Sequence, residues 1–198
     1  MSYETDIQNK EVIAEEIFIG HPKAKFASAI SNSTLKNCEV TIIGSSSTLL
    51  SHVVFDNCTI NCKRASSHIF QSVKFIHCKF VGLLKDSVIG SPDLDSDGFD
   101  AEIRDCDFTE LEMNLVDFRH GLALTSCKWP SWPHVVFERT NDTRQALKQL
   151  KLPKQVSRLI GMRVLGNKNY LVFNMSKYDC DLGSIHKSLS GSPHVFSN

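Results

Sequence analysis

The stretch that decides the fold runs from Leu35 to Phe80 and contains three copies of one short pattern. The copies are Leu35-Lys-Asn-Cys-Glu-Val40, Phe55-Asp-Asn-Cys-Thr-Ile60 and Phe75-Ile-His-Cys-Lys-Phe80, whose cysteines recur every 20 residues. Two later stretches keep the pattern, namely Ile103-Arg-Asp-Cys-Asp-Phe108 and Leu124-Thr-Ser-Cys-Lys-Trp129. An internal period of this length is typical of a solenoid, in which each repeat stacks on the next.

Within this period, large apolar residues recur every five positions. Stepping by five from Ile30 meets an apolar residue at nearly every step as far as Phe80, and the steps resume from Ile103 to Phe118. The residue two places before each of these is mostly small or apolar, Ile43 being one example. Helices repeat near 3.6 residues and half-buried strands near 2, so neither explains a period of five. Five residues per side fit a square coil whose turns stack about 4.8 Å apart.

We therefore predict an all-β fold with a small α/β appendage: a right-handed parallel β-helix of four-sided coils, capped by a C-terminal helical and hairpin element. The predicted boundaries are an N-terminal cap at 1–27, the β-helix at 28–130, a capping subdomain at 131–181 and a flexible tail at 182–198. Between Phe80 and Ile103 the frame slips by eight residues, which we assign to an acidic loop insertion at about 86–98. Caps are expected because a bare terminal coil exposes core and unpaired strand edge.

The repeats resemble those of the pentapeptide-repeat proteins, in which a small residue, often with Asp or Asn, is followed by Leu or Phe and then two free positions. The best matches are Cys106-Asp-Phe108 and Val116-Asp-Phe118, and the resemblance covers about half of the chain. The sequence departs from the family in using Cys or Val where Ala is usual. The resemblance implies the four-sided β-helix. It also implies two kinds of function, toxin immunity and DNA mimicry.

The C-terminal third does not carry the five-residue period and is predicted to cap the rod. Two prolines in the stretch from Trp129 to Phe137 end the coil. We expect a short helix from about residue 141 to Pro153 and a second one after it. A β-hairpin is predicted from residues 162–165 and 170–173 around a turn at 166–169.

The seven cysteines are an odd number without close pairs, so we expect free thiols in a reducing compartment. One interpretation of the recurring cysteines, with Cys62 and His77, is a zinc site, because thiolate and imidazole bind zinc. The cysteines fall at the small inward position, where a thiol acts as a compact apolar residue. We therefore predict no metal and no cofactor. Asn37, Asn57, His77 and Asp105 precede successive cysteines, which predicts a polar ladder at one corner of the coil.

Charge is unevenly distributed although the formal net charge is zero. From Asp86 to Asp117 there are eleven acidic residues and one basic residue, whereas from Arg139 to Lys168 there are eight basic residues and one acid. Such asymmetry indicates either contact between the two segments or partners of opposite sign. The predicted partner-binding residues are Asp93, Asp95, Asp97, Asp100 and Glu102.

The same acidic loop also resembles half of a calcium-binding loop. Asp93, Asp95, Asp97 and Gly98 match its first positions, but the twelfth, which should be Glu, is Arg104. A solvated acidic loop is the favoured interpretation, with calcium binding as the alternative.

No motif for catalysis is found: the sequence has no glycine-rich phosphate loop, nucleophile elbow, zinc-protease helix or CxxC pair. We expect no enzyme and no catalytic residue, but a protein-binding module of the immunity or inhibitor type that neutralises a toxin or another enzyme. The alternatives are a DNA mimic acting on a topoisomerase or other DNA-binding protein, and nucleic-acid binding through the basic segment. We expect a cytoplasmic, bacterial protein, monomeric or homodimeric, with no membrane contact, since neither a secretory signal nor an apolar run of about 20 residues is present.

Overall fold

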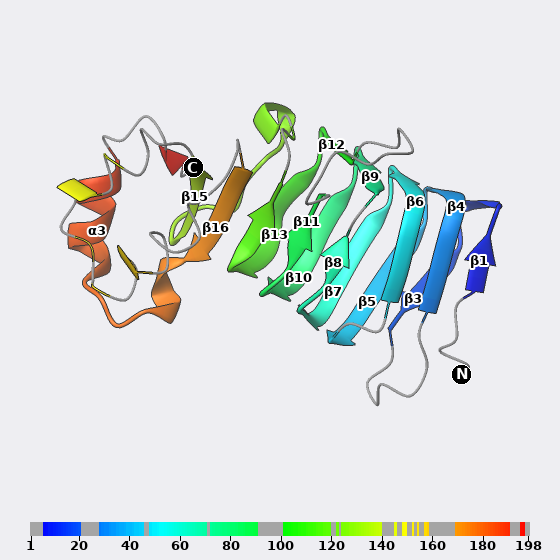
Figure 1. Ribbon diagram of the computed structural model, residues 1–198, viewed down its shortest axis with the longest axis horizontal. Coiled ribbons are helices and arrows are strands. Elements are labelled where there is room, and N and C mark those ends of the chain that lie inside the picture. Colours follow the sequence, from blue (N-terminus) through cyan, green and yellow to red (C-terminus); the bar gives the residue numbers. More distant parts are fainter. Residues whose placement is uncertain are drawn as a thin grey trace.

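The computed structural model describes residues 6–20, 28–45, 48–70, 72–90, 101–119, 122, 124–139, 169–190 and 195–196, with single positions between 145 and 158. In these ranges the chain is mostly β-strand, and the strands stack along the long axis of the molecule (Figure 1). A short helix lies near the C-terminus.

Three sheets run along the stack. Sheet A consists of β1 (Asp6–Gln8), β2 (Glu11–Ile13), β4 (Ser28–Lys36), β6 (Thr48–Asp56), β9 (Val73–Ile76) and β12 (Glu102–Arg104). Sheet B consists of β3 (Glu16–Ile19), β5 (Glu39–Ser45), β7 (Thr59–Ser66), β10 (Lys79–Lys85) and β13 (Asp107–Asn114). Sheet C begins with β8 (Ile69–Phe70), β11 (Val88–Ile89) and β14 (Val116–Phe118).

The pairing register confirms a parallel β-solenoid with coils of about 20 residues. Leu35 is paired with Phe55, Phe55 with Phe75, and Phe75 with Ile103, in parallel throughout. Corners are marked by non-glycine residues in the left-handed region. One turn has four of them, with φ of 57° at His52, 52° at Asn57, 55° at Arg64 and 58° at Ser67, and the set begins again at Ser72.

The core is a continuous column of inward side chains, with aromatic rings from neighbouring levels in contact. The ring centroids are 5.1 Å apart for Phe55 and Phe75, 4.7 Å for Phe80 and Phe108, and 5.2 Å for Phe108 and Trp129. All five rings are buried. Trp129 therefore extends the predicted frame to its fifth copy.

The five-residue frame is interrupted on sheet B, where three pairings shift register. As a result Ile42 is the buried residue and Ile43 is only half-buried, which corrects the inward position predicted for Ile43. One shift falls at Gly82, with φ of +95°. A Cβ atom there would lie 2.4 Å from the Cys62 carbonyl oxygen, so only glycine fits this close approach.

The insertion lies later than predicted. Val88 and Ile89 pair with both β8 and β14, so they belong to the coil rather than to a loop at 86–98. Because β12 resumes the stack at Glu102, the extra residues fall within 90–101. Residues 91–100 lie outside the described part of the chain.

Both ends of the stack carry added elements. At the N-terminus, β1 and β2 pair with β4, and β3 pairs with β5, so residues 6–19 form a partial coil within the predicted cap. At the other end, sheet C continues through antiparallel strands: β16 (Asn169–Asn174), β15 (His134–Arg139) and β17 (Val195–Phe196). The described part of the chain also contains two 3₁₀ helices, η1 (Leu124–Ser126) and η2 (Met175–Lys177).

The C-terminal region has a second core, formed by one face of β15 and β16 and by α3 (Leu182–Leu189). Ile185 and Leu189 of α3 are buried. The flexible tail predicted for 182–198 is therefore wrong for residues 182–189, which form a helix because two of its apolar side chains pack on the cap. The second strand of the predicted hairpin is present as β16. Its predicted first strand, at 162–165, lies outside the described residues. The helices predicted after residue 141 have no described bounds, because only single positions are described there.

Candidate interaction surfaces

The predicted partner-binding residues are only partly described. Asp93, Asp95, Asp97 and Asp100 lie outside the described residues. Glu102 lies on β12 with its side chain 38% accessible, and its carboxylate is 3.3 Å from Arg104 Nε and 3.9 Å from Lys74 Nζ. Glu102 is thus engaged in ion pairs within the molecule.

Four of the recurring cysteines, Cys38, Cys58, Cys78 and Cys106, form a buried column, and Cys127 is half-buried. The Sγ atom of each of the four contacts a backbone carbonyl oxygen of the level before it, at 3.3 Å for Cys58 and Leu35 O and at 3.4 Å for Cys78 and Phe55 O. Cys62 lies apart from the column, and burial raises the pKa of its thiol to about 12, which keeps it protonated at neutral pH. All seven cysteines are free.

The polar ladder predicted in front of these cysteines is present at one corner. Asn57 Nδ2 donates a hydrogen bond of 2.7 Å to Asn37 Oδ1. His77 lies next in the ladder, 3.2 Å from Asp56 Oδ1 and 3.7 Å from Asp105 Oδ2. All of these contacts are exposed, which suits a corner that stacks polar side chains and gives no enclosed site.

Most described acidic side chains on the later levels have a basic neighbour. Lys79 Nζ is 2.6 Å from Glu110 Oε1, and this partner raises the pKa of Lys79. Lys177 Nζ is 2.6 Å from Glu112 Oε1. Hydrogen bonds from Thr109 hold the pKa of Asp107 below its usual range. These faces of the rod therefore alternate in charge.

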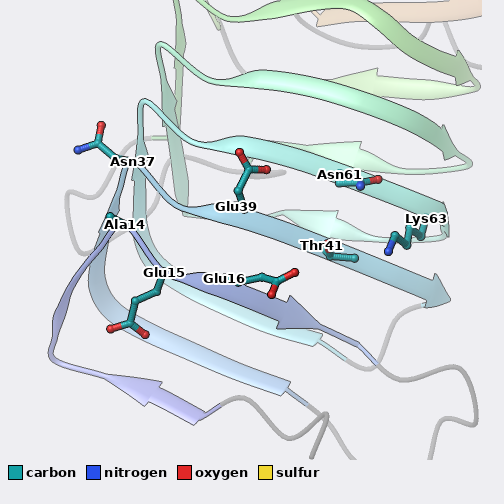
Figure 2. A pocket seen from close by; sticks show the side chains of 8 residues that line it. All are labelled: Ala14, Glu15, Glu16, Asn37, Glu39, Thr41, Asn61 and Lys63. Atoms are coloured by element: carbon teal, nitrogen blue, oxygen red, sulfur yellow. The ribbon is translucent and has the colours of Figure 1, made fainter. Parts of the chain in front are cut away.

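The first levels of sheet B differ, because they carry a group of acidic side chains that we call the acidic patch: Glu15, Glu16 and Glu39 (Figure 2). All three are exposed, and within the described residues none has an ion-pair partner. Glu16 and Glu39 are register partners on adjacent parallel strands, so two acidic residues are neighbours at the strand spacing of about 4.8 Å between backbones. Like charges in this arrangement are destabilising.

The acidic patch lines a shallow depression of about 350 Å³ that is open to solvent. Its floor runs over neighbouring strands of sheet B, with Asn37 at the corner and Lys63 at the far side (Figure 2). A second depression, of about 410 Å³, lies beside β12 and η1 and includes Glu102 and Arg104, which already pair with each other. Neither is an enclosed cavity suited to a small molecule.

Sequence reasoning missed the acidic patch because it treated residues 1–27 as a cap outside the repeat. A signal was present: Ile7, Val12 and Ile17 are five residues apart, and all three are buried. Extending the five-residue frame backwards would have placed Glu16 on an outer face of the solenoid.

Comparisons with protein-family models, with curated proteins and with solved structures found no match. Among the described residues, no three Cys, His, Asp or Glu side chains come together in a way that could hold a metal ion. Within the same ranges, no helix is both long and apolar enough to cross a membrane.

Proposed function

We propose that the protein is a non-enzymatic protein-binding module of the immunity or inhibitor type, which neutralises a partner protein such as a toxin or another enzyme. The observation that supports this best is the acidic patch. Three exposed carboxylates, none with an ion-pair partner in the described part of the chain, lie at the first levels of sheet B, and two of them belong to register partners. An arrangement that costs folding free energy is easier to explain if a basic partner neutralises it.

The surface around the patch also fits a macromolecular partner. Backbone hydrogen bonds along sheet B fix the spacing of its side chains, so binding orders few groups. The depression is shallow and polar, and shallow polar surfaces suit protein contacts better than small-molecule binding. Exposed carboxylates would speed association with a basic surface and make it sensitive to salt.

The test is affinity capture of the tagged protein from lysate of its own cells at low and high salt, with mass spectrometry of the retained proteins. A protein retained at both salt concentrations is then purified and titrated by calorimetry. We expect one partner at 1:1 stoichiometry, weakened by Glu16→Gln with Glu39→Gln. The matched control is Glu110→Gln with Glu112→Gln, which removes the same charge from residues that already have basic neighbours.

Two outcomes would contradict the proposal. Recovery of nucleic acid alone, lost as salt rises, would indicate direct nucleic-acid binding. Turnover of any retained molecule would show an enzyme. Recovery of a topoisomerase would keep a protein partner but favour DNA mimicry over toxin immunity.

A further inference from the structure

The outer edge of β2 presents backbone groups that face away from the rest of sheet A. Thr34 N donates to Lys10 O and Ala14 N donates to Lys36 O, both at 2.9 Å, so Lys10 and Ala14 face β4. Backbone groups alternate in direction along a strand, and those of Glu11 and Ile13 therefore point to the other side. No strand in the described ranges pairs with β2 on that side.

The side chains on this edge combine acid and apolar character. Ile13 is 55% exposed, and only one other large apolar side chain in the described residues, Ile69, is as exposed. Glu11, two residues earlier on the same face, forms an ion pair with Lys36. Lys10 precedes the strand, and Glu15 and Glu16 follow it after Ala14, so beyond the Glu11–Lys36 pair the edge keeps one net negative charge.

We infer that β2 is a docking edge for an extended segment of the partner protein, one that presents basic and aliphatic side chains in alternation along one face. The inference rests on the proposed function and names the chemistry of the partner. Strand addition would satisfy the outward N–H and C=O groups of Glu11 and Ile13. An aliphatic side chain would cover Ile13, and a basic one would lie beside Glu11 or Glu15.

Charge decides between this partner and a second copy of the chain. A second copy placed edge to edge would bring another edge of the same net negative charge against this one. Like charges brought together at an interface oppose association. Charged residues on an edge strand are also a common means of preventing self-association. A basic segment would instead be attracted by the net negative charge of this edge.

The first probe is the synthetic peptide Lys-Thr-Val-Thr-Lys-Thr-Val-Thr, titrated into ¹⁵N-labelled protein and followed by NMR. We expect saturable shifts at Glu11 and Ile13. Ile13→Lys should weaken binding by about tenfold or more, since it removes the apolar contact and adds a like charge. The matched control is Ile69→Lys, which adds the same charge at the other exposed isoleucine and should leave binding unchanged.

The second probe is the same peptide with N-methylated amides, which keeps the charge and side chains but cannot donate backbone hydrogen bonds. We expect its binding to be lost. The inference is overturned if the peptide does not bind, if the methylated peptide binds equally well, if Ile13→Lys has no effect, or if the protein itself dimerises through β2. The capture experiment separates failure of this inference from failure of the proposed function. If wild type and Ile13→Lys retain the same partner equally, β2 is not the docking edge but the proposed function still holds.

Discussion

Replacing Phe108 with Ala tests whether the aromatic column is the continuous core of the solenoid. Phe108 is fully buried, and its ring contacts those of Phe80, Trp129 and Phe118 at centroid distances of 4.7, 5.2 and 5.9 Å. Removing a buried Phe side chain costs about 3–5 kcal/mol of unfolding free energy. Each contact between two aromatic rings contributes about 0.5–1.5 kcal/mol to the unfolding free energy beyond the burial of its area. We therefore expect a loss of about 4 kcal/mol.

Urea unfolding measures this loss directly. With a slope of about 2 kcal/mol per molar urea, the midpoint should fall by about 2 M. Circular dichroism is the main signal, because Trp129 contacts Phe108 and its fluorescence will change for local reasons as well. Ile69→Ala is the control: its side chain is 57% exposed, and its effect should stay within about 0.5 kcal/mol. A loss below about 1.5 kcal/mol for Phe108→Ala would refute the reasoning from packing.

Three further predictions concern other parts of the molecule. Gly82→Ala should lower the unfolding free energy by about 1–3 kcal/mol, because φ is +95° and the new Cβ would lie 2.4 Å from Cys62 O. Thermal unfolding checks this, and an unchanged melting temperature would contradict the close approach of the two backbones. Burial lowers the pKa values of His68 and His134, so the folded protein binds fewer protons than the unfolded chain and stability should fall as pH drops below about 6.5. Urea midpoints between pH 7.5 and 5 check this, and His68→Gln should make the decline shallower. Asp93→Lys with Asp95→Lys should weaken partner capture while leaving the circular dichroism spectrum unchanged; full affinity would show that the acidic loop is not the interface.

The solenoid could be predicted because the spacing of apolar residues in the sequence identifies individual inward positions of each coil. Each 20-residue period places a large apolar residue at most of its fifth positions, and Leu35, Phe55 and Phe75 are register partners. The polar corner from Asn37 to Asp105 could be predicted for the same reason, since residues at equal places in the period must stack. Where the period breaks, at Gly44 and Gly82, sequence alone does not say which residue is skipped, and Ile43 was placed wrongly.

Two other features could not be read from periodicity. The acidic patch depends on which outward carboxylates lack a basic neighbour, and neighbours come from adjacent levels rather than from adjacent residues. Helix α3 depends on a cap whose apolar surface is formed by distant strands. Its local signal was present in Asp181, whose carboxylate accepts hydrogen bonds from Gly183 N and Ser184 N at 3.0 and 3.4 Å.

The cysteine column has a practical consequence for following how the molecule opens. One thiol lies at each successive level, at Cys38, Cys58, Cys78, Cys106 and Cys127, and all but the last are fully buried. A thiol shielded by its own level reacts with a labelling reagent only when that level separates from its neighbours. The order in which the five thiols become labelled would therefore report the direction of opening along the rod. The labelling rate of each cysteine would measure how often its own coil opens.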